Sequence, residues 1–189
     1  MKHLRLIPFL MLASLVFIGC DSDDDNPPPV NESEVITNFE IELTGPNTVT
    51  LTSIDLDGPE GPNAPVVTVN GTLNADSVYA GSISLLDASD PLDIENITVE
   101  VEEEDLEHKF FYCVENGLNA TISDPNLDSA GDVLGTTFTL TTTGASSGDL
   151  TFTLVHDGDK SASVDGCDNS ALLGNGEIDI TQSFSVTIQ

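Results

Sequence analysis

Residues 38–54 read NFEIELTGPNTVTLTSI, and apolar and polar side chains alternate along most of this segment. Ile41 and Leu43 alternate with glutamate and threonine, and Val49 and Leu51 alternate with threonine. A period of two places every second side chain on the same face of a β-strand, whereas a helix needs a period near 3.6. The segment therefore predicts two β-strands, each with one buried face.

The same patterning continues to the C-terminus and is rich in β-branched residues. It marks eight further strand candidates: Val66–Val69, Val78–Leu86, Ile97–Val101, His108–Glu115, Leu118–Ser123, Leu134–Thr142, Leu150–His156 and Ile178–Ile188. One alternative stays open, a short helix within Glu100–Lys109 in place of the strand that begins at Ile97. About nine or ten short strands with turn signals between them predict an all-β fold, an antiparallel β-sandwich.

Three Asn-Gly pairs mark turns between these segments. Asn116-Gly117 lies between two strand candidates and is the strongest hairpin signal, because both turn residues must adopt positive φ. Asn175-Gly176 gives a similar signal before the last strand. Asn70-Gly71 is compatible with either a turn or a bulge.

The spacing between Leu73 and Tyr79 indicates which type of β-sandwich the chain forms. Leu73 lies six residues before Tyr79, which is near the start of a strand candidate. This spacing resembles the tyrosine corner of fibronectin type III and other immunoglobulin-like domains, where the tyrosine hydroxyl bonds to upstream backbone. The resemblance covers residues 73–79 and implies an immunoglobulin-like sandwich.

The N-terminal residues resemble a bacterial lipoprotein signal. Lys2 and Arg5 precede an apolar run, Leu6–Ile18, that is too short to span a bilayer comfortably, and Gly19 then precedes Cys20. This arrangement resembles the lipobox, which implies cleavage before Cys20 and attachment of acyl chains to its sulfur. An ordinary secretory signal with an accidental cysteine is the alternative.

An acidic run follows the cysteine, and it consists of Asp21, Ser22, Asp23, Asp24 and Asp25. It resembles the export signal that sends Bacteroidota lipoproteins to the outer face of the outer membrane. We therefore expect a lipid-anchored protein at the cell surface. The expected organisation is a signal peptide at residues 1–19, the lipidated cysteine with an acidic, proline-rich tether at residues 20–34, and a single β-sandwich domain at residues 35–189.

The charge of the chain is strongly negative. From Cys20 onward the sequence has two basic and 33 acidic residues, a formal net charge of −31. Such a surface repels nucleic acid and anionic lipid headgroups and attracts cations. We therefore expect no nucleic-acid partner, although the acidity is also explained by solubility alone.

Two cysteines remain if Cys20 carries lipid. Cys113 lies in a strand candidate, and Cys167 lies in a long segment with few apolar residues. In an exported chain two cysteines favour one disulfide, with two buried thiols as the alternative.

Two histidines form the main candidate site. His108 begins one strand candidate and His156 ends another, and each continues the apolar face of its strand. If the two strands are antiparallel neighbours, the rings meet at one rim of the core. With nearby carboxylates they form a candidate site for zinc or a similar divalent metal: His108, His156, Glu104, Asp157 and Asp159. In the alternative, the histidines cap the core and bond to backbone.

Aspartates in turns are a weaker candidate for calcium. Asp55-Leu56-Asp57-Gly58 and the later Asp124, Asp128 and Asp132 supply hard oxygen atoms, but the EF-hand pattern is incomplete and turn formation is the simpler role. No G-x-S-x-G motif marks a nucleophile. We therefore expect no enzymatic activity.

Several blocks resemble a poorly characterised group of Bacteroidota surface lipoproteins. They are residues 57–65, 102–112, 154–160 and 184–189. The resemblance implies a surface lipoprotein that serves as an accessory to a TonB-dependent receptor. Together with the acidic domain and its histidines, it favours a non-catalytic module that binds a metal ion or a small cationic complex. The alternative is an adhesive or structural module that contacts proteins or glycans.

Overall fold

The alternating segment forms a β-hairpin within the larger of two sheets. In the computed structural model, which describes residues 34–58, 61–164 and 166–189, β1 (Asn38–Thr44) pairs antiparallel with β2 (Thr48–Ile54). Every second side chain of each strand is buried, as the period of two predicted.

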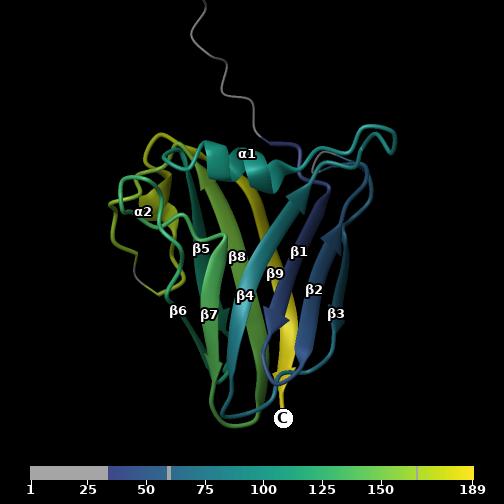
Figure 1. The fold of residues 1–189 in the computed structure, drawn as a ribbon, viewed down its shortest axis with the longest axis vertical. Coiled ribbons are helices and arrows are strands. Elements are labelled where there is room, and N and C mark those ends of the chain that lie inside the picture. Colours follow the sequence, from purple (N-terminus) through teal and green to yellow (C-terminus); the bar gives the residue numbers. More distant parts are fainter. Residues whose placement is uncertain (1–33, 59–60, 165) are drawn as a thin grey trace, which may run out of the picture. The chain divides into compact units, whose positions relative to one another are not determined.

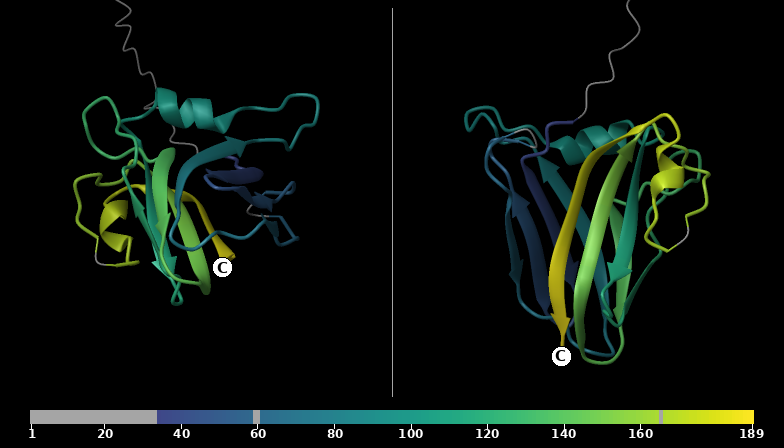
Figure 2. Two further views of the ribbon diagram at one scale, coloured as in Figure 1. Left: turned by 60° about the horizontal axis from the view of Figure 1, so that its bottom comes forward. Right: turned by 180° about the vertical axis from the view of Figure 1, so that it is seen from behind.

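Nine strands form two antiparallel sheets that pack face to face (Figure 1, Figure 2). The larger sheet has the order β3-β2-β1-β4-β7-β6, and its other strands are β3 (Val66–Asn70), β4 (Val78–Leu86), β6 (Ala120–Ser123) and β7 (Thr137–Thr142). The smaller sheet has the order β5-β8-β9, formed by β5 (His108–Glu115), β8 (Ser146–His156) and β9 (Glu177–Ile188). The predicted all-β antiparallel sandwich is confirmed.

The strand order is that of a constant-type immunoglobulin domain with an added hairpin. Such domains place strands A, B, E and D in one sheet and strands C, F and G in the other. The orders β1-β4-β7-β6 and β5-β8-β9 match these two sheets, and β2 and β3 are inserted between the first two strands of the pattern. The inserted β3 lies close to β9 across the sandwich, so the insertion adds a wall beside the free edge of the smaller sheet.

Aromatic rings from both sheets fill the centre of the core. Phe39 of the larger sheet contacts Phe110, Phe152 and Phe184 of the smaller sheet, with ring centroids 6.0–6.3 Å apart. Tilted and edge-on ring pairs at this separation add to the free energy of apolar burial. Phenylalanine therefore fills the centre of a chain that contains no tryptophan.

The outer face of the smaller sheet is covered as well. Phe111 and Cys113 pack against Leu172 of the short helix α2 (Ser170–Leu173). A disulfide joins Cys113 to Cys167, with the two Cα atoms 5.2 Å apart, well inside the range that a bridge spans. The pairing favoured from the sequence is thus present, and it holds the β8–β9 connection against β5.

The prediction of a strand at Ile97–Val101 is wrong, because helix α1 spans Ile97–Glu103. Ile97 and Val101 lie four residues apart on one helical face and are buried, whereas Val99 is 48% exposed. Over five residues an Ile-x-Val-x-Val pattern satisfies both a period of two and an i, i+4 pair, so the pattern alone did not separate the two structures. The helix lies across one end of the sandwich (Figure 1).

The Asn116-Gly117 turn has the predicted backbone but the wrong partner strand. Both residues adopt positive φ, 56° and 84°. However, β5 pairs with β8 and β6 pairs with β7, so the turn carries the chain from one sheet to the other instead of closing a hairpin. At Asn175-Gly176 the positive φ belongs to the preceding Gly174 (52°), whereas at Asn70-Gly71 it belongs to Gly71 (100°), which turns the chain after β3.

Tyr79 makes the contact that the tyrosine corner implies. Its hydroxyl accepts a hydrogen bond from the backbone N–H of Asn74 (2.8 Å) and donates one to the Asn47 side chain (2.8 Å). Immunoglobulin domains carry this tyrosine near the start of strand F. Here it lies near the start of β4, which occupies the place of strand B.

The predicted lipidation site Cys20 and the predicted export signal Asp21–Asp25 lie outside the described residues. Within the part of the chain that the structure describes, no helix is long and apolar enough to cross a membrane.

Candidate functional site

Strands β5 and β8 bring the two histidines together at the end of the sandwich that α1 covers. His108 and His156 are direct partners in the antiparallel register. Their rings stack with centroids 4.4 Å apart and an interplanar angle of 24°. Both residues are buried, with exposed fractions of 0% and 4%. The strand parity read from the sequence predicted this meeting, and it is confirmed.

The protonation of His108 follows from its hydrogen bond. Its Nδ1 lies 3.2 Å from the backbone oxygen of Glu104, at the C-terminal end of α1. A carbonyl oxygen only accepts hydrogen bonds, so Nδ1 carries the proton and the neutral ring presents a bare lone pair at Nε2. That Nε2 is buried and has no hydrogen-bond partner among the described residues. Metal-binding histidines commonly have this arrangement, in which a carbonyl fixes the ring and leaves the other nitrogen free.

His156 has the opposite arrangement. Its Nε2 lies 3.5 Å from an oxygen of the Glu107 carboxylate, which accepts a hydrogen bond from it. The Nδ1 atom is therefore the bare one, and it too is buried without a hydrogen-bond partner in the described chain. The stacked pair thus exposes two nitrogen lone pairs to the interior of the protein.

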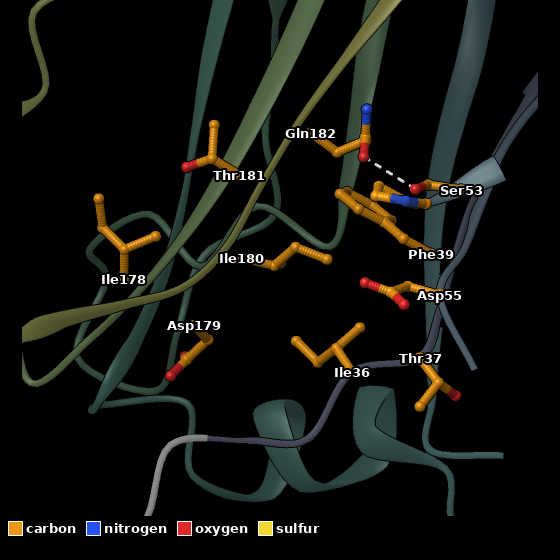
Figure 3. A pocket seen from close by; sticks show the side chains of 11 residues that line it. Ile36, Thr37, Phe39, Ser53, Asp55, Ile178, Asp179, Ile180, Thr181 and Gln182 are labelled. Atoms are coloured by element: carbon orange, nitrogen blue, oxygen red, sulfur yellow. Dashed lines mark hydrogen bonds between the residues drawn. The ribbon is translucent and has the colours of Figure 1, made fainter. Parts of the chain in front are cut away.

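A β-bulge in β9 adds a carboxylate. Leu154 pairs with Ile180, but Val155 pairs with Ile178, so Asp179 is an extra residue in the strand (Figure 3). In an unbroken register Asp179 would face Val155, on the opposite side of the sheet from the histidines. The bulge redirects the side chain, as bulges at binding sites commonly do.

Asp179 and His108 face each other across the site. The Asp179 side chain is 0% exposed, and its Oδ2 lies 4.0 Å from Nε2 of His108. Neither carboxylate oxygen has a hydrogen-bond partner of ordinary geometry in the described part of the chain. A bare imidazole nitrogen and a carboxylate are both acceptors, so this buried arrangement requires a cation or a proton between them.

The pKa shifts fit a site without bound protons. Burial lowers the pKa of His108, and the neighbouring charge of His156 lowers it further. Burial raises the pKa of Asp179 to about 6, and the charge of Glu177 adds to this rise, whereas His156 and the backbone of Glu34 oppose it. At neutral pH the imidazole of His108 is therefore neutral and the Asp179 carboxylate is mostly ionised, which is the state that a metal ion needs.

The structure gathers some of the predicted ligands. Donor atoms of Glu104, His108 and His156 lie within 4.8 Å of one another, and a second group joins Asp157 and Glu107 to His156. The carboxylates of these groups are exposed, in contrast to Asp179.

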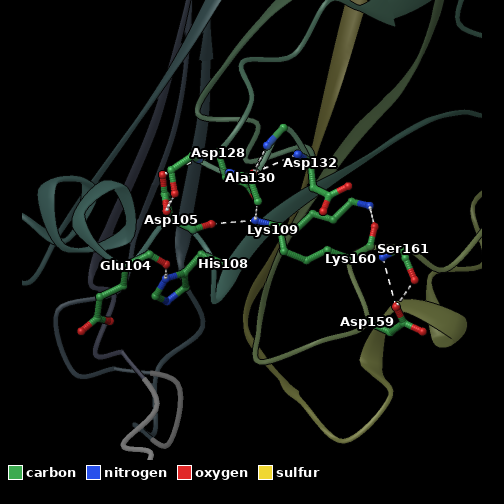
Figure 4. Close-up of polar contacts among 12 residues, drawn as sticks. Glu104, Asp105, His108, Lys109, Asp128, Ala130, Asp132, Asp159, Lys160 and Ser161 are labelled. Carbon is green, nitrogen blue, oxygen red and sulfur yellow. Dashed lines mark hydrogen bonds and ion pairs between the residues drawn. The ribbon is translucent and has the colours of Figure 1, made fainter.

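Asp159 lies apart from this site. Its Oδ1 accepts hydrogen bonds from the backbone N–H (3.0 Å) and hydroxyl (2.6 Å) of Ser161 (Figure 4). Asp159 therefore holds the turn that follows β8, and the structure does not place it with the histidines.

Two acids near the site, the buried Asp179 and the half-buried Glu34, were not predicted from the sequence. Asp179 lies between Ile178 and Ile180, where strand alternation assigns it to the outer face. Glu34 precedes the first strand, and burial raises its pKa to about 7, with the charges of Glu100 and Asp179 adding to the rise. An acid between two isoleucines is the sequence signal for the first, but it becomes meaningful only when the bulge is known.

Asp128, one of the aspartates considered for calcium, has other partners. Oδ1 of Asp128 accepts backbone N–H bonds from Ala130, Gly131 and Asp132, and Oδ2 lies 2.5 Å from the ammonium group of Lys160. This residue forms a turn, the simpler role considered from the sequence.

The chain matches no family model, no curated protein and no solved structure. Function must therefore be inferred from the chemistry of the site.

Proposed function

We propose that this protein is a non-catalytic lipoprotein of the cell surface that binds a divalent transition-metal ion between His108, His156 and Asp179. The observation that carries the proposal is the pair of buried acceptors at 4.0 Å, the Nε2 atom of His108 and the Asp179 carboxylate. A protein interior tolerates such a pair when a cation bridges it.

The donor set indicates the class of ion. Two imidazole nitrogens with one carboxylate suit zinc, copper or nickel, whereas magnesium and calcium prefer oxygen ligands. Zinc–nitrogen and zinc–oxygen bonds of about 2.0–2.2 Å place two ligands of one ion at most about 4 Å apart. The separation between His108 and Asp179 lies within that reach, and donor atoms of Glu104 and His156 lie within 4.8 Å of a donor atom of His108.

The proposed location depends on the N-terminal residues. The resemblance of Gly19-Cys20 to a lipobox and of Asp21–Asp25 to an export signal supports a lipid anchor on the outer membrane. A metal site on such an anchored domain fits a role in delivering the ion to an outer-membrane receptor of the TonB-dependent class.

Calorimetric titration of the purified full chain tests the metal site. We expect zinc, nickel or copper to bind with one ion per chain. His108→Ala and His156→Ala should each weaken binding by about 100-fold or more, since each removes a ligand. Glu42→Gln is the control, because Glu42 lies on the exposed face of β1. No binding by the parent, or equal binding by the parent and both histidine variants, contradicts the proposal.

Protease added to intact cells tests the location separately. We expect it to remove the domain, and we expect alanines at Asp21–Asp25 to leave the protein protected inside the outer membrane. Protection of the unaltered protein contradicts surface display without bearing on the metal site.

A further inference from the structure

A pocket of about 270 Å³ opens beside the metal site, between β9 of the smaller sheet and the β1–β2 hairpin of the larger sheet (Figure 3). Its walls are mainly apolar and include Ile36, Phe39 and Ile180. The volume is near the lower end of the range of about 300–1,000 Å³ for small-molecule sites, and far above the roughly 30 Å³ that one water occupies in the liquid.

Polar residues occupy core positions around this pocket. Along β2, the inward positions are Val49, Leu51 and Ser53, and Asp55 continues the same alternation beyond the end of the strand. On the opposite wall, Gln182 shares the inward alternation of Phe184 in β9. The buried face of a strand normally carries apolar residues along its whole length. On both β2 and β9 the inward residues change from apolar to polar at the pocket.

These polar residues differ in their bonding. Ser53 donates a 2.8 Å hydrogen bond to the Gln182 side chain, which links the two sheets at the pocket wall (Figure 3). The Asp55 carboxylate is directed toward Ile180 in the same view, and its Oδ1 is buried without a hydrogen-bond partner among the described residues. A buried carboxylate oxygen without a partner is costly, and a ligand that donates a hydrogen bond would remove that cost.

The lining fixes the sign of the ligand's charge. Its two ionisable residues are Asp55 and Asp179, and no basic side chain contributes to the described lining. The lining contains no imidazole, and most of its wall is apolar, which suits a ligand that has an apolar body as well as a charge. An organic cation satisfies both parts of the surface, because its charged group pairs with a carboxylate while its body replaces water against Phe39 and the isoleucines.

We propose that this pocket is a second binding site, which takes a small organic cation: an ammonium or amidinium group on a compact apolar body, with the charged group on Asp55. The proposal places the charged group on Asp55 and uses neither histidine, although Asp179 of the proposed metal site also lines the pocket.

Benzylammonium and its neutral counterpart benzyl alcohol test the proposal on the full chain, with EDTA present so that metal binding plays no part. We expect benzylammonium to bind with a dissociation constant of roughly millimolar or better, and to shift the amide resonances of Ser53 and Gln182. We expect benzyl alcohol to bind at least about tenfold more weakly. This comparison needs no substitution and is therefore independent of any folding defect.

The Asp55→Asn variant then tests whether the charged group of the ligand pairs with Asp55. It should weaken benzylammonium binding by about tenfold or more, as expected for the loss of a charge-assisted bond in a partly buried site. Glu42→Gln removes one charge from the exposed face of β1 and should leave binding unchanged. Equal binding of the two probes, shifts confined to another surface, or equal losses in both variants would overturn the proposal. Thermal melting of each variant confirms that it is folded.

Discussion

Two polar clusters lie close together at the end of the β5–β8 pair, and they differ in how their polar atoms are bonded. Figure 4 shows the first of them beside His108. The lysine cluster consists of Lys109, Lys160, Asp105 and Asp128. The histidine cluster consists of His108, His156 and Asp179. Adjacent residues of β5 thus supply one member to each cluster.

Ion-pair and hydrogen-bond contacts hold the lysine cluster together. The Lys160 ammonium donates to the backbone oxygen of Asp105 (2.6 Å) and lies 2.5 Å from Oδ2 of Asp128. The Lys109 ammonium donates to the backbone oxygen of Lys160 (2.8 Å). These bonds attach the β8–β9 connection to the loops beside α1, a structural role that requires no ligand.

The histidine cluster is bonded only in part, since each ring contacts one neighbour, Glu104 or Glu107, through one nitrogen. Two ring nitrogens and two carboxylate oxygens are buried without hydrogen-bond partners in the described chain. Because folded proteins satisfy nearly all buried polar groups, an exception of this size supports the proposed metal site. The hydrogen bonds and ion pairs of the two clusters therefore distinguish them better than the types of residue that they contain.

The largest effect on stability should come from the disulfide, which anchors the loop on the lysine side. The bridge joins residues 54 apart in sequence, and a loop of this length contributes about 4 kcal/mol to the free energy of unfolding in the chain-entropy model. Replacing both cysteines with serine should lower stability by about that amount in urea unfolding and leave zinc affinity unchanged. Mass spectrometry after alkylation of unreduced, exported protein provides the check. Two reactive thiols in that sample would contradict the bridge.

Lys160→Met should be the next largest change, because it leaves the Asp128 carboxylate without its cation. We expect the midpoint of thermal unfolding to fall by several degrees while metal titrations stay unchanged. Lys109→Met is the matched control, since its ammonium bonds a carbonyl and should matter less. Loss of metal binding in Lys160→Met would show that the two clusters are not separate.

In the metal-free protein, Asp179→Asn should change the free energy of unfolding by a smaller amount, and it should stabilise the protein instead of destabilising it. The pKa of Asp179 rises from about 3.8 when unfolded to about 6 when folded. Stability contributed by this group is therefore present below about pH 4 and is lost as the pH rises through 6. The variant should exceed the parent by about 1–3 kcal/mol at pH 8, since it removes an unpaired buried charge. The difference should disappear near pH 4.

Urea unfolding in EDTA at pH 4, 6 and 8 measures this difference. A less stable variant at pH 8 would show that Asp179 forms an ion pair with a protonated His108. In that case the cluster would be structural, like its lysine neighbour.

Strand parity was enough to predict the sandwich and the meeting of His108 with His156, because both depend on a period of two along uninterrupted strands. It failed where another contact decides the structure. The helix at Ile97–Glu103 depends on packing across the end of the sandwich, and the sheet change at Asn116-Gly117 depends on β5 pairing with β8. The burial of Asp179 was not predicted, because one extra residue in β9 moves its side chain to the other face of the sheet.

That extra residue also bears on how the site arises in evolution. The bulge divides β9 into two halves, and the alternation of side chains between the faces of the sheet is shifted by one residue from one half to the other. The C-terminal half alone supplies Phe184, Val186 and Ile188 to the core. Deletion of the single codon for Asp179 would restore an unbroken strand and leave every one of these core residues in place. The sandwich can therefore be inherited with or without the buried Asp179 carboxylate, and one insertion event is enough to acquire it.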